Sequence, residues 1–176
     1  LEEDAFRRDF TINALYYGVD DLNIIDYTDA IHDIHAKRLR LIGDPETRFR
    51  EDPVRMLRAV RFAAKLGFKI DESNEQQIVA VGDLLEDIPA ARLFDEVIKL
   101  FQSGHGVQSL RGLQHYNLLQ YLMPMTHGSM QTERAGHWQS FIEQALNNTD
   151  QRLSIGKTTN PAFMYAVLLW APVREY

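Results

Sequence analysis

Apolar residues recur at three- and four-residue spacing along most of the chain after Gly43. This periodicity predicts helices, with Gly, Pro, Asn and Asp in the gaps between them, over residues 75–85, 90–101, 107–116, 132–146 and 161–170. Before Gly43, two compact β-prone runs at residues 23–27 and 38–42 surround a segment with helical spacing. The pattern therefore predicts a mainly α protein with helical neck and body portions, preceded by a small α/β portion that contains two short strands.

Near the N-terminus, Phe10, Ala14 and Tyr17 fall on one face of a helix at 3.6 residues per turn, which predicts a short helix there. In RRDFTINAL, Asp9 and Asn13 are four residues apart, so a helix would place both on the same face. A carboxylate there could bind a divalent metal, and either side chain could hold a ribose. The alternative is a helix-capping Asp beside a solvated Asn.

The run DPETRFREDPVRMLRAVRFAAKLGF, residues 44–68, predicts a helix with clear ends. Asp52 is suited to be its N-cap, because Pro53 then takes the first helical position, where its missing N–H costs nothing. Gly67 is suited to end the helix as a C-terminal cap. One side of this helix is apolar, formed by Met56, Leu57, Val60, Ala63 and Ala64.

A second side of the same helix carries Arg55, Arg58, Arg61 and Lys65. The flat guanidinium fork can donate paired hydrogen bonds to phosphate oxygens or to a base edge, whereas a carboxylate such as Asp52 only accepts. Donor and acceptor three residues apart could read a nucleobase edge. The same spacing also fits a solvated basic face that acidic neighbours neutralise.

Charge is concentrated in this part of the chain. Residues 37–69 hold ten Lys or Arg against four Asp or Glu, a local +6, while the whole chain carries −6 and the remainder therefore −12. A basic segment within an acidic chain favours a focused anion site over a broad nucleic-acid surface.

Composition narrows the remaining possibilities. The 176 residues are 45% hydrophobic, enough for one core or two small ones, and they include no cysteine, which excludes disulfides and thiolate metal sites. No apolar run reaches the roughly 18 residues of a membrane span, so we expect no membrane partner and a cytoplasmic location. The chain begins without methionine and stops soon after an apolar run, so we also expect a fragment of a longer protein.

RRDFTINAL, followed about 30 residues later by LIGDPETRFREDPVRMLRAVRFAAKLGF, resembles the class II nucleotidyltransferases, the group of bacterial poly(A) polymerases and tRNA CCA-adding enzymes. DIPAARLFDEVIKLF at residues 87–101 and NPAFMYAVLLW at residues 160–170 resemble the poly(A) polymerase branch. The resemblance implies residues 1–43 as the end of a nucleotidyltransferase head, 44–103 as a neck that binds nucleotide and RNA, and 104–176 as a truncated body.

The resemblance also implies site residues. Asp9 corresponds to one of the catalytic carboxylates of the family, and Arg8 and Asn13 lie where the ribose and phosphates of the incoming nucleotide are held. Asp52 and Arg55 belong to an EDxxR motif that supplies Asp and Arg to the base edge. Nucleotide binding is further implied for Arg58, and RNA or phosphate contacts for Arg61 and Lys65.

One departure from the family pattern limits the expected activity. The Gly-Gly-x-Val-Arg-Asp segment and the Asp-x-Asp pair that bind the catalytic Mg²⁺ ions in the family do not occur in this sequence and would lie before Leu1. The resemblance implies ATP as substrate and an RNA 3′ end as partner, with most Mg²⁺ ligands outside this chain. Because two-metal phosphoryl transfer needs clustered carboxylates, we expect this chain alone to be inactive.

Three functions remain open at this stage. The first is part of a poly(A) polymerase that transfers AMP from ATP to RNA 3′ ends. The second is part of a tRNA CCA-adding enzyme, which no physical argument from these residues separates from the first. The third is a helical RNA-binding module without catalysis, in which Arg55 and Arg58 bind phosphate with no base preference.

Overall fold

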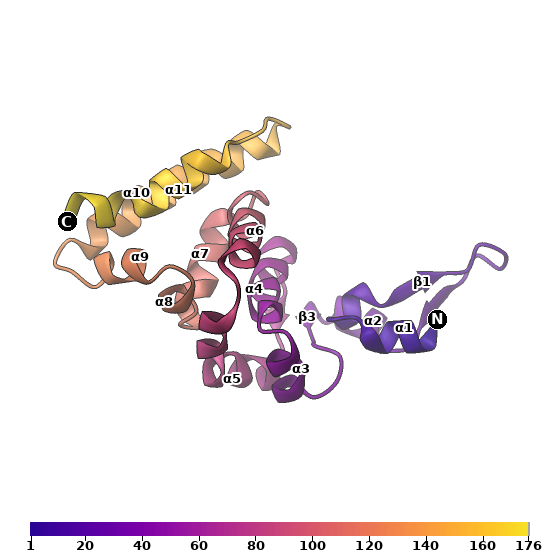
Figure 1. The fold of residues 1–176 in the computed structure, drawn as a ribbon. Coiled ribbons are helices and arrows are strands. Elements are labelled where there is room, and N and C mark those ends of the chain that lie inside the picture. Colours follow the sequence, from indigo (N-terminus) through magenta and orange to yellow (C-terminus); the bar gives the residue numbers. More distant parts are fainter. Residues whose placement is uncertain (176) are drawn as a thin grey trace. The chain divides into compact units, whose positions relative to one another are not determined.

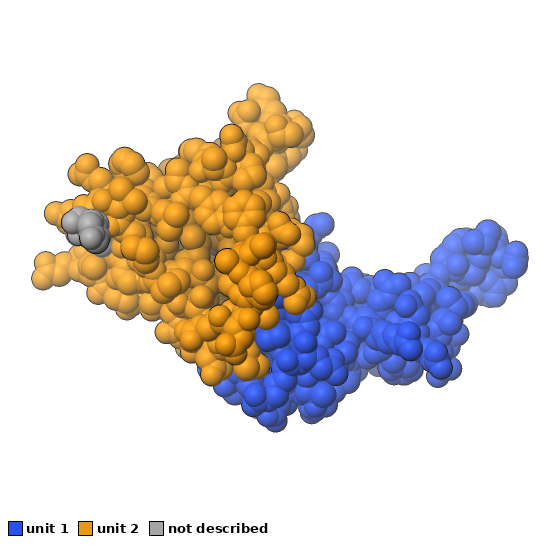
Figure 2. Space-filling model, in the orientation of Figure 1, with its two compact units in different colours: residues 1–81 blue, residues 82–176 orange. Residues whose placement is uncertain are grey.

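The computed structural model describes residues 1–175, except for the side chain of Glu175. The chain forms two compact units, Leu1–Val81 and residues 82 onwards, which Figure 2 colours separately. Helices dominate both units, and the strands are short and confined to the first (Figure 1). The predicted class, mainly α with a small α/β portion, is confirmed. The predicted division at residues 43 and 103 stays a prediction.

The first unit begins with the helix α1 (Glu2–Arg7), the 3₁₀ turn η1 (Thr11–Asn13) and the strand β1 (Leu15–Tyr17). The predicted helix through Phe10 and Tyr17 is therefore wrong. Phe10 instead makes an isolated bridge to Leu41, and Leu15–Tyr17 pair antiparallel with the strand β2 (Ile24–Asp26), in the register Leu15 opposite Asp26. Pairing with distant backbone outweighs the local helical spacing, because Leu-Tyr-Tyr also suits a strand.

The helix α2 (Ala30–His35) and the strand β3 (Arg38–Leu39) follow, within the segments where a helix and a strand were predicted. The two predicted strands do not pair with each other. The strand β3 pairs in parallel with β4 (Lys69–Ile70), with Arg38 opposite Lys69 and Leu39 opposite Ile70. The strand β4 corrects the prediction of helix throughout residues after Gly43, since its two residues are too few to produce a visible alternation.

The basic run forms two helices rather than one. The helix α3 (Pro45–Glu51) is N-capped by Asp44, and α4 (Val54–Leu66) follows directly. The predicted ends of α4 hold to within a residue: the carboxylate of Asp52 accepts a hydrogen bond from the Val54 N–H at 3.2 Å, and Gly67 ends the helix at φ +65°. The helix α5 (Glu72–Ala80) completes the unit. Its core includes Phe10, Leu39, Phe49, Met56, Leu57 and Ile78.

The second unit is helical throughout its described residues. Its elements are the 3₁₀ helix η2 (Gly82–Asp87), α6 (Ala90–Phe101), α7 (Gly106–His115), α8 (Leu119–Leu122), α9 (Pro124–Ser129), α10 (Ala135–Ser154) and α11 (Pro161–Glu175). The core of this unit includes Leu100, Phe101, Leu110, Leu113, Leu118, Ile142 and Leu146. After a short loop, α11 packs along α10, as Figure 1 shows. Within residues 1–175, no helix combines the length and apolar character that a bilayer crossing requires.

Candidate nucleotide site

The loop between α1 and β1 carries the first set of predicted site residues and is fixed by backbone pairing. The Ile42 N–H donates to the Asp9 carbonyl at 2.8 Å, and the Thr11 N–H donates to the Arg40 carbonyl at 3.0 Å. The Phe10 side chain is fully buried between these contacts. The loop is therefore anchored at Asp9 and at Thr11, on both sides of Phe10, which restricts where the Asp9 carboxylate can lie.

The Asp9 carboxylate links this loop to α4. One oxygen, Oδ1, accepts from the Phe10 N–H at 2.8 Å and from Asn13 Nδ2 at 2.9 Å. The other, Oδ2, accepts from Arg58 Nε at 2.7 Å. Asp9 and Asn13 meet as predicted, but through the 3₁₀ turn and not along an α-helix. The structure thus brings together three predicted site residues from two separate motifs.

The Asp9 carboxyl group is held in its charged form. Its side chain is only 10% exposed, and this burial raises its pKa. The hydrogen bond from Asn13 and the charge and hydrogen bond of Arg58 act in the opposite direction and prevail, so the pKa of Asp9 lies below its usual range. An ionised carboxylate at neutral pH follows.

The start of α4 positions Arg55. Its Nη1 donates to the Arg48 carbonyl at 2.7 Å and to Glu51 Oε2 at 3.1 Å. Hydrogen bonds from Arg55 and then from Arg48 lower the pKa of the Glu51 carboxyl, so Glu51 is an anionic anchor for both arginines. Within the predicted EDxxR motif, Glu51 orients the Arg55 guanidinium, while Asp52, two residues before α4 begins, accepts a hydrogen bond from the Val54 N–H.

Further along α4, the cationic groups surround an aromatic ring. The guanidinium carbon of Arg61 lies 4.4 Å and that of Arg58 5.5 Å from the centre of the Phe62 ring. Phe62 itself packs edge-on against Phe10, with 5.7 Å between ring centres. The loop residue Phe10 and the helix residue Arg58 therefore share a common support.

Lys65 lies one turn further on and lines a different surface. Together with Asn13 it borders an apolar pocket of about 340 Å³, whose lining is completed by Ile12, Ile34, Phe62, Leu66 and Phe68. Arg8 is also turned away from the Asp9 cluster. Its Nη2 donates to Asp4 at 2.9 Å, and Asp4 also accepts from the Tyr16 hydroxyl at 2.6 Å. The structure thus gathers Asp9, Asn13 and Arg58 and separates Arg8 from them.

Arg48 is a site component that sequence reasoning missed. Its Nη2 donates to the carbonyls of Arg8 at 2.7 Å and Arg7 at 3.2 Å, and its Nε donates to the Ile42 carbonyl at 3.2 Å. Its Nη1 pairs with Glu51 at 2.7 Å. One side chain thus ties the Asp9 loop to the turn that holds Arg55. The contact between Arg48 and the Arg8 carbonyl spans 40 residues of sequence, so no local sequence pattern predicts it.

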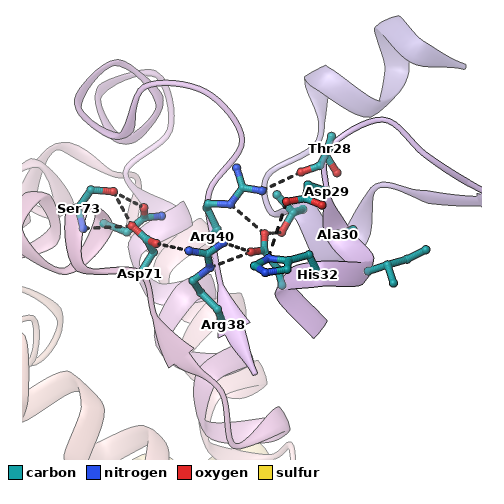
Figure 3. Close-up of polar contacts among 12 residues, drawn as sticks. Thr28, Asp29, Ala30, His32, Arg38, Arg40, Asp71 and Ser73 are labelled. Carbon is teal, nitrogen blue, oxygen red and sulfur yellow. Dashed lines mark hydrogen bonds and ion pairs between the residues drawn. The ribbon is translucent and has the colours of Figure 1, made fainter. Parts of the chain in front are cut away.

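Asp33, on α2, supports the loop between α1 and β1 through Thr11, and this role was not predicted from the sequence. Its fully buried carboxylate accepts from Thr11 Oγ1 at 2.8 Å, from Arg38 Nε at 2.8 Å and from Arg40 Nε at 2.9 Å. Figure 3 shows Arg40 reaching on to the carbonyl of Thr28 and Arg38 reaching toward Asp71. The charges of Arg38 and Arg40 are therefore paired within the fold.

A metal site would need further metal-ligating side chains close to Asp9. Among residues 1–175, no three His, Cys, Asp or Glu side chains gather closely enough to hold a metal ion. Both oxygens of Asp9 already have partners within the chain. The described residues alone therefore do not fit the Mg²⁺ site that the resemblance implies.

Two family descriptions match the sequence. Residues 1–40 match "Poly A polymerase head domain", and residues 67–130 match "Probable RNA and SrmB-binding site of polymerase A". The first match contains Asp9 and Asn13, and the basic run lies mostly between the two.

Curated relatives and solved structures agree with these matches. The chain is 48% identical over 175 residues to Poly(A) polymerase I of Escherichia coli O6:H1, which covers 99% of this chain and 38% of that protein. It is 44% identical over 116 residues to the CCA-adding enzyme of Latilactobacillus sakei, covering 66% of this chain and 28% of the relative. A tRNA nucleotidyltransferase solved with a primer tRNA and an incoming ATP analog has a TM-score of 0.75 and 27% identity, covering 96% of this chain and 49% of that one.

Proposed function

Because the chain belongs to the family of bacterial poly(A) polymerases and tRNA CCA-adding enzymes, we propose that it supplies the nucleotide-selecting part of an enzyme that transfers AMP from ATP to RNA 3′ ends. The chain spans 38% of the length of the Escherichia coli relative, so this activity is proposed for an enzyme that contains the chain. The poly(A) polymerase match extends over nearly the whole chain and the CCA-adding match over about two thirds, which favours AMP addition.

The observation that carries the proposal is the ion pair between Asp9 and Arg58. It joins the RRDFTINAL segment to the basic helix α4 across 49 residues of sequence, and it brings Asn13 to the same carboxylate. A solvated basic face would not require such a contact. An anion bound beside this pair would meet the exposed third of the Arg58 side chain.

Selection of the base is assigned to Asp52 and Arg55. Arg55 is held through Nη1, so its remaining N–H groups are those with which it would donate to a base. Adenine and cytosine each present an amino donor beside a ring-nitrogen acceptor on their pairing edge, whereas guanine and uracil present a carbonyl acceptor beside an N–H donor. A carboxylate acceptor and a guanidinium donor match the first arrangement and oppose the second.

The chemistry of transfer needs more than this chain offers in its described residues. Bound Mg²⁺ ions supply charge neutralisation of the triphosphate and activation of the attacking hydroxyl. Asp9 is engaged by Asn13 and Arg58, and no second carboxylate contacts it in residues 1–175. We therefore propose that the 176-residue chain binds nucleotide without transferring AMP, and AMP incorporation into an RNA primer by the purified chain with Mg²⁺ would disprove this part.

The test is a titration of the protein with ATP, CTP, GTP and UTP. We expect ATP to bind about tenfold more tightly than GTP, because a matched pair of hydrogen bonds to a base edge is worth about 1–3 kcal/mol. Asp52→Ser should abolish most of this preference while its hydroxyl keeps the cap on the Val54 N–H.

Glu46→Ser is the matched control. Glu46 lies six residues away in sequence, pairs with Arg50 at the surface, and its removal deletes the same charge. It should leave the ratio of ATP to GTP affinity unchanged. Equal binding of all four nucleotides, with Asp52→Ser without effect, would favour a non-catalytic RNA-binding module.

The CCA-adding alternative is separated by products of an enzyme that contains this chain. Long A tracts made from ATP alone support the poly(A) assignment. Addition that stops after CCA on trimmed tRNA, and that requires CTP, supports the alternative.

A further inference from the structure

A pocket with a mixed polar and apolar lining lies within the second unit, and none of its lining residues has been assigned a role so far. It has a volume of about 510 Å³ and is lined by Asn148, Thr149, Arg152, Thr158, Thr159, Asn160 and Phe163. These residues belong to the end of α10, the loop after it and the first turn of α11. The volume lies within the range of about 300–1,000 Å³ that small-ligand sites occupy.

The loop that closes the pocket is fixed in place by contacts at both ends. Arg152 Nε donates to the Thr158 carbonyl at 2.9 Å, and the Lys157 N–H donates to the Arg152 carbonyl at 3.1 Å. Gly156 takes a positive φ of +72°, which allows the chain to reverse after α10. At the far end, Asn160 Oδ1 accepts the Ala162 N–H at 2.9 Å. The pocket is thus preformed, and a ligand would not have to order the loop.

The lining presents hydrogen-bonding groups that the fold leaves available. Asn160 and Asn148 each use the amide oxygen, with Asn148 Oδ1 accepting from Gln144 at 3.2 Å, so each NH₂ group is left as a donor. The Thr159 Oγ1 atom is buried and has no hydrogen-bond partner among residues 1–175. A buried hydroxyl without a partner is costly, and a polar ligand would remove that cost.

An aromatic ring and a guanidinium complete the lining. Phe163 is 50% exposed on the first turn of α11, and Arg152 is exposed beside it. The neighbouring acid, Asp150, is already committed, because its carboxylate accepts the Gly106 N–H at 2.9 Å. The pocket is therefore locally cationic in a chain whose net charge is −6. A ring for stacking, amide donors and a cation together match a nucleotide.

We propose that this pocket binds one nucleotide of a single-stranded RNA, with its base stacked on Phe163 and its phosphate at Arg152. The assignment rests on the proposed function, which makes RNA the substrate. It extends RNA contact beyond residues 67–130, the segment that matches the RNA-binding description.

The test measures binding of a fluorescent oligoadenylate of about ten nucleotides to the protein, with site-directed variants. Phe163→Ala should weaken binding about tenfold, because one base–aromatic stack is worth about 1–3 kcal/mol. Phe163→Tyr keeps the ring and should restore binding to within about twofold of the original chain. Phe163 is exposed, so both variants should fold, and circular dichroism checks this.

Arg152→Ala should weaken binding severalfold, and Arg134→Ala is its matched control. Arg134 is an exposed arginine at the opposite end of α10, about 27 Å away at 1.5 Å rise per residue. Its loss removes the same charge without touching the pocket. If Arg134→Ala and Arg152→Ala weaken binding equally and Phe163→Ala has no effect, the pocket is not an RNA subsite.

A free nucleotide could bind the same pocket with the same contacts, and titration with AMP distinguishes it from a nucleotide within an RNA strand. If AMP binding depends on Phe163 and oligoadenylate binding does not, the assignment to an RNA strand is overturned. Failure of the pocket is distinct from failure of the proposed function. In the first case the unaltered chain still prefers ATP over GTP through Asp52; in the second this preference is absent, whether or not oligoadenylate binds.

Discussion

The buried carboxylate of Asp33 shows how single residues support the candidate site. Burial raises its pKa, but hydrogen bonds from Thr11 and Arg38 and the charge of Arg40 prevail, so the pKa of Asp33 lies below its usual range. A group whose pKa is lower in the folded state stabilises the fold above its unfolded-state pKa of about 3.9. This contribution is lost as pH falls through the lower folded-state pKa.

We expect Asp33→Asn to lower the free energy of unfolding by about 2 kcal/mol at neutral pH, because two arginines lose a buried anionic partner but remain about one-third exposed and can be hydrated. Urea unfolding followed over a pH series measures the effect. The difference between Asp33→Asn and the original chain should begin to shrink below about pH 4, where the unfolded chain takes up a proton at Asp33, and it should be lost as pH falls through the lower folded-state pKa.

Asp29→Asn is the control for this prediction. Asp29 lies four residues earlier, its side chain is 70% exposed, and its backbone is left-handed at φ 64°, which Asn tolerates well. This variant should unfold at nearly the same urea concentration as the original chain. A pH dependence of Asp33→Asn identical to that of the original chain would show that Asp33 contributes nothing through its charge.

At the scale of elements, the N-cap residue of α7 makes no side-chain hydrogen bond, and a side chain of α10 caps this helix instead. The Asp150 carboxylate accepts the Gly106 N–H at 2.9 Å and the Val107 N–H at 3.4 Å. Gly106 suits this approach, since a Cβ there would lie 3.1 Å from Leu146.

Asp150→Ala should therefore cost about 1–2 kcal/mol of stability, as loss of a helix N-cap does. Asp150→Asn, which keeps an oxygen acceptor, should recover most of it. Thermal unfolding of both variants provides the comparison. If Asp150→Ala melts at the same temperature as the original chain, water satisfies the α7 N-terminus equally well.

Elements with local signals were predictable from the sequence, and contacts between distant segments were not. The two ends of α4 can be predicted from Asp52, Pro53 and Gly67. Its cationic side can be predicted from the three-residue spacing of Arg55, Arg58 and Arg61. The strand β1 was missed because Leu-Tyr-Tyr fits either period until its partner β2 is known.

The candidate site shows the same limit. That Asp9 and Asn13 meet could be predicted from their spacing, whereas the Arg48 contacts to residues 7 and 8 arise only from the packed fold. The sequence motifs therefore predicted the cluster of Asp9, Asn13 and Arg58, whereas its supporting residues Arg48 and Asp33 were found only in the tertiary structure.

At the scale of the whole molecule, the basic run is less available to RNA than its composition suggests. Of the ten basic side chains in residues 37–69, six are arginines in ion pairs within the chain, namely Arg38, Arg40, Arg48, Arg50, Arg55 and Arg58. The net charge of −6 also disfavours a broad contact with a polyanion. The affinity for RNA should accordingly depend on a few phosphates.

The number of phosphates that the protein contacts can be measured from the binding of oligoadenylate at several salt concentrations. For single strands, the logarithm of the binding constant falls with the logarithm of salt by about 0.7 for each phosphate neutralised. Three or four contacts, from Arg152 and from Lys37, Lys65 and Lys69, give a slope of about −2 to −3. Ten contacts would give about −7, which would mean that the ion pairs of the basic run open when RNA binds and that the focused site proposed here is wrong. Because Arg152→Ala removes one phosphate contact, it should make the slope shallower by about 0.7, and Arg134→Ala should leave it unchanged.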